Sequence, residues 1–359
     1  MTLYILYSAD YELYLGGNYS EEKEVLIDPT DNLLDIFDNL KIPLTIFADI
    51  FSILRYKEQN LSNFPRDAEN QLKEAVRRGH DVQSHVHPHW NYTRIEGKKY
   101  TVNLDYFLLG KLDPDKERLY EKILKYLTTS RTYLQNLLQP VDKNYQCIAF
   151  RAGGYGLQPN SDILIKALTE AGFVIDSSIV PDLIDRTNVN ETDFSVVPRL
   201  ANYYLDADLS VPSKDCRGIF EIPMPSCKFN LTDTLRYKTI AVVSYLKNST
   251  KQGNAKGYAI QQTGNKYTKY FNFVASLGNG FDYLNCSTNE ERMFECTRKY
   301  LMQFDPGTTS VFFSFNMHPK SMTEEHFSAL KNYHSKLFSY YQGNIQAISF
   351  QQAAEMIRL

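Results

Sequence analysis

Short apolar runs alternate with amphipathic segments along most of the chain. The runs at Leu3–Tyr7 and Leu44–Ala48 are typical of buried strands. The segment Asp115–Leu138 keeps apolar residues three and four positions apart, which is typical of a helix with one face on a core. Further strands are predicted at Asp81–Ser84, Cys147–Phe150, Gly218–Ile222, Val311–Phe315 and Ile345–Ser349, and further helices at Thr30–Leu40, Asp67–Arg78, Asn160–Ala171 and Glu324–Tyr341.

Two glycines mark the ends of predicted helices. Gly79 follows the basic pair Arg77-Arg78, and Gly172 follows the helix predicted at Asn160–Ala171. Glycine adopts positive φ at little cost, which suits the residue just past a helix. We therefore expect both helices to end at these positions.

The alternation of strands and helices predicts an α/β fold. Such a pattern favours a parallel sheet, either doubly wound or closed into a barrel. The stretch from about 187 to 289 breaks the rhythm and is rich in Asn, Lys, Thr and Tyr, so we interpret it as long insertions at the rim. With no internal repeat and no clear linker in the sequence, residues 1–359 are interpreted as a single domain.

Composition excludes several classes of function. The net charge of −3 gives no sign of the concentrated basic surface that nucleic-acid binding needs. No stretch of the sequence approaches the roughly 20 apolar residues of a membrane-spanning helix. The first residues lack the basic and long apolar regions of a signal peptide. Five widely spaced cysteines without a CxxC pair suit reduced thiols, so we expect a cytoplasmic protein.

Reactive side chains follow four of the predicted strands. Asp10 follows the first strand, His85 the third, Arg151 the fourth and His318 the strand at Val311–Phe315. In a (β/α) barrel the C-terminal strand ends converge on one face, where such enzymes place their chemistry. We therefore expect these residues to share one barrel mouth.

Three histidines alternate within five residues, at His85, His87 and His89. Imidazole is a preferred ligand of zinc and of neighbouring transition metals. His85 and His89 can face one ion from a helix-like turn, which Pro88 would stiffen. A polar loop of hydrogen-bonded histidines is the alternative, but three histidines together with an acid at another strand end favour a metal site.

The acids and the arginine suit the same site. Asp10 and Glu12 lie on one face of an extended segment, which allows two roles at one metal, although acids at strand ends also cap loops. Arg151 stands between an apolar strand and the pair Gly153-Gly154, so we expect it to orient a carboxylate. His318 alone is compatible with a core or a functional position.

These residues together resemble the polysaccharide deacetylase family with the NodB-homology domain. Gly79–Trp90, which ends in HVHPHW, looks like the family's metal-binding His-x-x-x-His motif. Phe150–Gly156 is similar to its arginine motif, and Ser8–Glu12 stands where the family keeps its aspartates. Gly172–Ser178 resembles the fourth motif and Met317–Pro319 the last, which carries the general-acid histidine.

The resemblance implies a distorted, usually seven-stranded (β/α) barrel that hydrolyses N- or O-acetyl groups of carbohydrates. It also implies one divalent metal ion, for which we expect zinc. The family has adjacent aspartates in its first motif, whereas here the second position is Tyr11 and the nearest acid is Glu12. Either Asp10 is the general base and Glu12 completes the metal site, or Asp10 binds the metal and Glu12 has another role.

The resemblance assigns a role to each residue. We predict that His85 and His89 bind the metal with Glu12 or Asp10, that Asp10 is the base and that His318 is the acid. Arg151 would position the base. Substrate contacts are predicted for His87 (which could instead bind the metal), Trp90, Gly154, Tyr155 and Asp176.

The predicted partner is an acetylated carbohydrate. The 26 tyrosines suit stacking on sugar rings. One alternative is hydrolysis of another non-peptide C–N bond in a small amide, and the other is a carbohydrate-binding protein without catalytic activity.

Overall fold

A computed structural model describes residues 1–13, 21–97, 99–187, 189–215, 217–237, 239, 280–304 and 310–357. Its main sheet contains seven parallel strands in the order β11-β7-β6-β3-β2-β1-β14. These are β1 (Thr2–Tyr11), β2 (Thr45–Asp49), β3 (Asp81–Val86), β6 (Ala149–Ala152), β7 (Ile175–Asp176), β11 (Phe220–Glu221) and β14 (Ser310–Met317).

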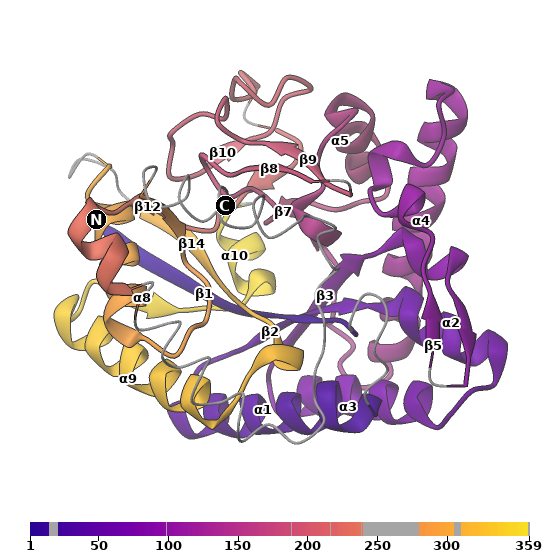
Figure 1. Cartoon of the computed structure of the whole chain (residues 1–359), viewed down its shortest axis with the longest axis horizontal. Coiled ribbons are helices and arrows are strands. Elements are labelled where there is room, and N and C mark those ends of the chain that lie inside the picture. Colours follow the sequence, from indigo (N-terminus) through magenta and orange to yellow (C-terminus); the bar gives the residue numbers. More distant parts are fainter. Residues whose placement is uncertain are drawn as a thin grey trace.

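The sheet curls, and helices cover its outer side (Figure 1). They are α1 (Asp28–Leu40), α2 (Ile50–Gln59), α3 (Phe64–Arg77), α4 (Lys116–Leu138), α5 (Ser161–Glu170), α8 (Glu290–Leu301) and α9 (Glu324–Tyr340). The last helix, α10 (Phe350–Ile357), instead packs against the inner side, where Phe350 contacts Phe47. The predicted distorted (β/α) barrel is therefore confirmed. Two further strands extend the sheet: β10 (Tyr203–Tyr204) pairs antiparallel with β11, and β15 (Ile345–Ala347) pairs parallel with β1.

Alternation along the strands separates an inner from an outer face. In β1, Leu6 packs with Phe47 and Phe312 inside the barrel, whereas Tyr7 packs outward against Phe37 of α1 and His334 of α9. Because successive side chains of a strand point to opposite faces, Asp10 falls on the same inner face as Leu6.

The barrel closes without a continuous ladder between its two ends, since β14 and β11 are not paired strands in the described residues. One backbone bond joins the two edges, from the Ser314 N–H to the Pro223 carbonyl at 3.1 Å. The Asn202 amide adds a second link: its Nδ2 donates to the carbonyls of Glu221 (3.3 Å) and Phe312 (2.9 Å), and its Oδ1 accepts from the Phe312 N–H. A third link runs through residues 284–286, where the Leu284 N–H donates to the Pro225 carbonyl and the Cys286 N–H to the Asn316 carbonyl.

Most predicted helices and strands are present with shifted ends, and both predicted helix-ending glycines are confirmed. Gly79 and Gly172 each have φ of 84°, and their N–H groups donate back to the last turns of α3 and α5. The sequence pattern does not predict α2, because its apolar residues follow those of β2 with only Asp49 between them. It also does not predict α8, which begins directly after the segment assigned to the rim.

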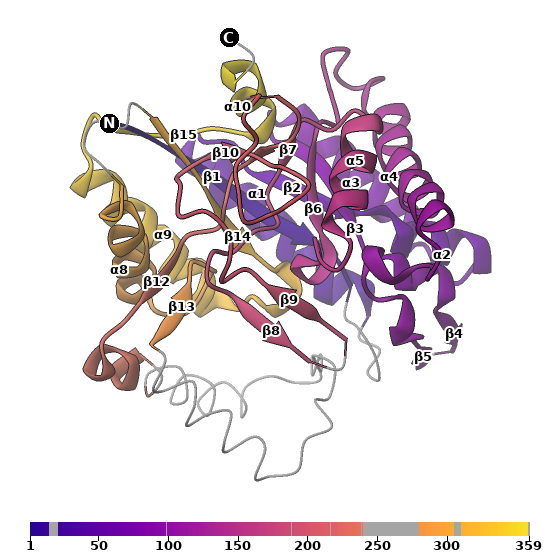
Figure 2. The same ribbon diagram turned by 90° about the horizontal axis from the view of Figure 1, so that it is seen from above.

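Three small antiparallel sheets of two strands each lie at the rim. They are β4 (Arg94–Glu96) with β5 (Lys99–Thr101), β8 (Ile184–Arg186) with β9 (Glu191–Asp193), and β12 (Ser226–Lys228) with β13 (Phe281–Tyr283). In Figure 2 both termini and α10 lie at one end of the main sheet, and the pairs β8–β9 and β12–β13 at the other.

Much of the predicted rim insertion at 187–289, including residues 238 and 240–279, lies outside the described residues. The extent of that insertion and the single domain at 1–359 therefore stay predictions. Among the described residues, no helix is both long enough and apolar enough to cross a membrane.

Candidate active site

Side chains from four strands meet at the C-terminal end of the barrel. Asp10 lies in β1 and Glu12 one residue beyond it, His85 lies in β3, Arg151 lies in β6, and His318 follows β14. Asp10 is part of a strand rather than of a loop, because β1 continues to Tyr11 through its pairing with β2. Contacts between these side chains, described below, bring all five together at this mouth.

The Asp10 carboxylate is held on both of its oxygens. Arg151 Nη1 donates to Oδ1 at 2.7 Å, and Asn316 Nδ2 donates to Oδ2 at 2.9 Å. His318 Nε2 lies 3.4 Å from Oδ2. Burial would raise the pKa of Asp10, but nearby positive charge, chiefly that of Arg151, holds it below its usual value. Asp10 is therefore an oriented, ionised carboxylate at neutral pH.

Arg151 is itself fixed by several contacts. Its side chain is fully buried, with Nε donating to the Ser177 carbonyl at 2.9 Å and Nη2 to the Ser314 hydroxyl at 2.8 Å. The guanidinium also stacks over the Phe47 ring at 4.1 Å. A cation held so tightly fixes the orientation of its carboxylate partner.

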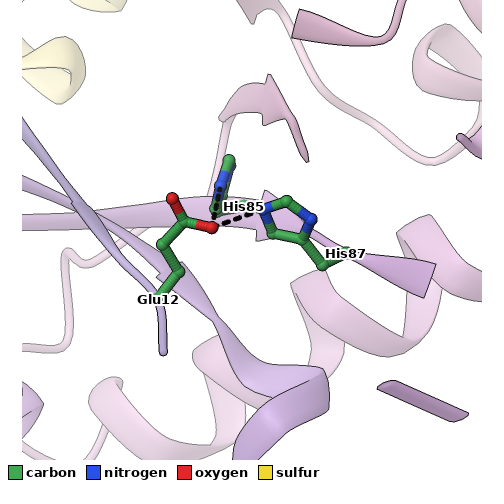
Figure 3. A group of neighbouring side chains, drawn as sticks. All are labelled: Glu12, His85 and His87. Carbon is green, nitrogen blue, oxygen red and sulfur yellow. Dashed lines mark ion pairs between the residues drawn. The ribbon is translucent and has the colours of Figure 1, made fainter. Parts of the chain in front are cut away.

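Glu12, His85 and His87 form a compact group with ligand atoms all within 4.8 Å of one another. Figure 3 shows both imidazoles facing one carboxylate oxygen of Glu12, with Nε2 of His87 at 2.6 Å and Nε2 of His85 at 3.8 Å from Oε2. His85 Nδ1 lies 2.9 Å from the Arg151 carbonyl, which fixes the ring and turns Nε2 toward Glu12.

This group fits a divalent metal ion. Both Nε2 atoms are buried, neither makes a hydrogen bond of good geometry within the described residues, and the polar atom that both face is Glu12 Oε2. Buried polar atoms normally make such a bond, and two imidazoles with a carboxylate are a donor set that suits zinc and related transition metals.

The other oxygen of Glu12 faces the opposite side of the mouth. Lys320 Nζ lies 3.0 Å from Oε1, and His318 Nε2 lies 3.5 Å from it. Asp10, Glu12 and His318 form a second group that satisfies the same distance limit. Asp10 already accepts two hydrogen bonds and Lys320 already brings positive charge to Glu12, so the first group is the better candidate for a metal ion. Burial would raise the pKa of Glu12, but Lys320 and His87 hold it well below its usual value.

His89 does not join either group of possible ligands in the described residues. It lies in the 3-10 helix η2 (Pro88–Tyr92), where its ring stacks on Phe107 at 5.9 Å between centroids. The arrangement differs from the predicted His85 and His89 pair because β3 runs on to Val86. An extended chain places residues two apart on one face, so His87, not His89, accompanies His85.

The predicted substrate-binding residues differ in where they lie: Trp90 and Asp176 are buried, whereas Gly154 and Tyr155 lie in a turn. Trp90 is only 1% exposed and packs edge-on to Tyr100, and Asp176 is fully buried, accepting from the Ser178 N–H and hydroxyl. Gly154 and Tyr155 form the turn after β6, both with φ near 60°.

The glycine before this turn is required by His87. A Cβ on Gly153 would come within 2.5 Å of His87 Nδ1, so only glycine lets the ring lie there. The carbonyl of Gly154 accepts from Asn190 Nδ2 at 2.8 Å, which ties the turn to the β8–β9 hairpin.

Sequence reasoning missed three polar residues of the mouth: Asp49, Asn316 and Lys320. Asp49 is fully buried at the end of β2; burial raises its pKa to about 6, opposed by the charges of His87 and His85. It directly follows the predicted strand Leu44–Ala48, so the rule that selected Asp10 and Arg151 would also have selected it.

Comparison with known proteins found similarity among solved structures alone. No protein-family model matches the chain, and no curated protein matches it. Similar solved structures include a putative polysaccharide deacetylase from Mycobacterium smegmatis, at 14% identity and a TM-score of 0.49, covering 99% of this chain and 90% of that one. An allantoinase has 12% identity and a TM-score of 0.47, with 98% and 89% covered. A CE4 family pseudoenzyme from Bacillus anthracis has 9% identity and a TM-score of 0.39, with 97% and 64% covered.

Proposed function

We propose that this chain is a metal-dependent hydrolase that removes acetyl groups from a carbohydrate. The observation that carries the proposal is the pairing of two units at one barrel mouth. The first unit is Asp10, which is oriented by Arg151. The second unit is Glu12, whose Oε2 faces the buried imidazoles of His85 and His87. A base next to a metal site is what hydrolysis of an acetyl group requires. The motifs that resemble those of polysaccharide deacetylases suggest the substrate class.

Glu12, His85 and His87 would hold the ion. When bound, it would polarise the acetyl carbonyl and lower the pKa of a water molecule, to about 7 in favourable zinc sites. The contact between His85 Nδ1 and the Arg151 carbonyl keeps its Nε2 available for the metal, as is usual for metal-binding histidines.

Asp10 would act as the general base. It is ionised at neutral pH because of Arg151, and two hydrogen bonds fix its plane. The proton taken from the attacking water would reside on Oδ2, the oxygen nearer to His318.

His318 would deliver a proton to the leaving group. Burial lowers its pKa, and the charges of Asp10 and Glu12 only partly oppose this, so the ring is neutral at neutral pH. Its Nε2 is 3.4 Å from Asp10 Oδ2 and can receive the proton that Asp10 has taken. The His318 side chain is 31% exposed, against 4% for Asp10, so it can reach a substrate at the mouth.

The test is acetate release from a panel of N- and O-acetylated glycans, with small amides measured in parallel. We expect acetate from at least one glycan and no hydrolysis of the amides. Amide hydrolysis without acetate would replace the proposal with the small-amide alternative. Saturable glycan binding without any turnover would replace it with a carbohydrate-binding protein.

A further inference from the structure

Asp49 stands in the middle of a row of polar side chains across three adjacent strands. The strand order is β3-β2-β1, and Asp49 pairs in register with His85. On the other side Ala48 pairs with Tyr11, so the next residues along, Asp49 and Glu12, are also level. Neighbours in register on a parallel sheet point to the same face. Asp49 therefore enters the mouth between Glu12 and His85.

Only one of the two carboxylate oxygens of Asp49 is hydrogen-bonded within the described residues. Oδ1 caps α2 by accepting from the Phe51 N–H at 3.2 Å. Oδ2 is buried and has no hydrogen-bond partner within the described residues. A buried acceptor left unpaired costs about 1–3 kcal/mol, and more when it is charged.

Asp81, the first residue of β3, is a buried carboxylate that differs from Asp49 in its hydrogen bonds. It is likewise buried, but its Oδ1 accepts from Gln83 Nε2 at 2.8 Å and its Oδ2 from Thr45 Oγ1 and the Gln351 N–H, at 3.3 and 3.1 Å. Asp81 is thus a satisfied structural carboxylate. Oδ2 of Asp49 has no such partner within the described residues.

Tyr11 cannot supply this partner or a second acid. It stands at the position of the family's second aspartate but on the outer face of β1, where Asp31 of α1 and Asp67 of α3 raise the pKa of its buried hydroxyl further than burial alone does. Any acid in the mouth beyond Asp10 and Glu12 has to come from another strand.

We propose that Asp49 is the second carboxylate of the metal centre. Asp49 lies outside both groups of closely spaced ligand atoms, and its Oδ2 would turn to bind the cation that Glu12, His85 and His87 hold. The inference rests on the proposed metal-dependent function and extends its ligand set to the strand between β1 and β3. Oδ1 continues to cap α2, which anchors the ligand to the scaffold.

Co²⁺ titration of the full chain tests this ligand, with Asp49→Asn as the variant and Asp81→Asn as its matched control. Asparagine also caps helices, so α2 keeps its N-terminus. We expect Asp49→Asn to weaken Co²⁺ binding by at least about 10-fold and to change the visible absorption of the bound ion. Asp81→Asn should change neither, although it also removes a buried carboxylate.

Equal Co²⁺ affinity and spectrum in wild type and Asp49→Asn would overturn the role of Asp49 and leave the proposed function standing. A wild-type chain that binds no divalent ion would overturn both. If Asp49→Asn does not fold, as judged by circular dichroism in chelator, Asp49→Ser carries the same prediction, since serine also caps α2.

Discussion

Replacing Asp10 with Asn is expected to slow acetate release by about 100- to 10,000-fold while the metal ion stays bound. The amide keeps the shape of the side chain but cannot take a proton from water. Asp10 makes its close contacts with Arg151, Asn316 and His318. It does not belong to the proposed metal-binding group of Glu12, His85 and His87. Substrate affinity and metal content should therefore change little.

Glu12→Gln is the matched comparison, because it removes the neighbouring carboxylate two residues away. Oε2 of Glu12 faces both imidazoles, so this variant should lose metal affinity as well as activity. Metal content and single-turnover rates of both variants check the assignment. A metal-free Asp10→Asn protein, beside a Glu12→Gln protein that keeps its ion, would exchange the two roles.

His87→Ala is expected to lower metal affinity by at least about 100-fold, because even outer partners of metal ligands cost 10- to 100-fold when removed. Acetate release should fall with it. His89→Ala removes an equally buried imidazole two residues further on, but one stacked on Phe107 outside both groups of possible ligands. The His89→Ala protein should therefore keep the ion, although it loses the stability that the packing of His89 supplies.

Metal analysis after gel filtration, with circular dichroism as the check on folding, measures the difference between these two variants. If His89→Ala comes out metal-free and His87→Ala retains a full complement, the ion lies with His85 and His89, as the motif alone suggests. The same result would remove the reason to include Asp49.

The barrel was predictable because its strands and helices carry clear periods. The apolar runs that become β1, β2, β6 and β14 are short and bounded by polar residues, and α4 keeps one apolar face over 23 residues. The closure of the barrel was not predictable, since it depends on the amide of Asn202 reaching Phe312, 110 positions away. Such a contact leaves no periodic signal.

The candidate site was predictable as a set of strand-end residues but not in its detail. The position at which β3 ends decides which histidine points to the same side as His85. Because the chain is extended at Val86, that residue is His87; a helical turn starting at Val86 would place His89 there instead. Strand ends are the least certain feature of any pattern-based prediction. Lys320 gave no signal, because a lysine after a proline-containing turn is ordinary surface sequence.

The most direct test of the central claim is acetate release measured before chelation, after it, and after a divalent ion is restored. We expect about one bound ion per chain, loss of acetate release when the ion is removed, and recovery of acetate release when the ion is restored. The Asp10→Asn protein should regain the ion without regaining the rate. Undiminished acetate release from fully metal-free, folded protein would contradict the account.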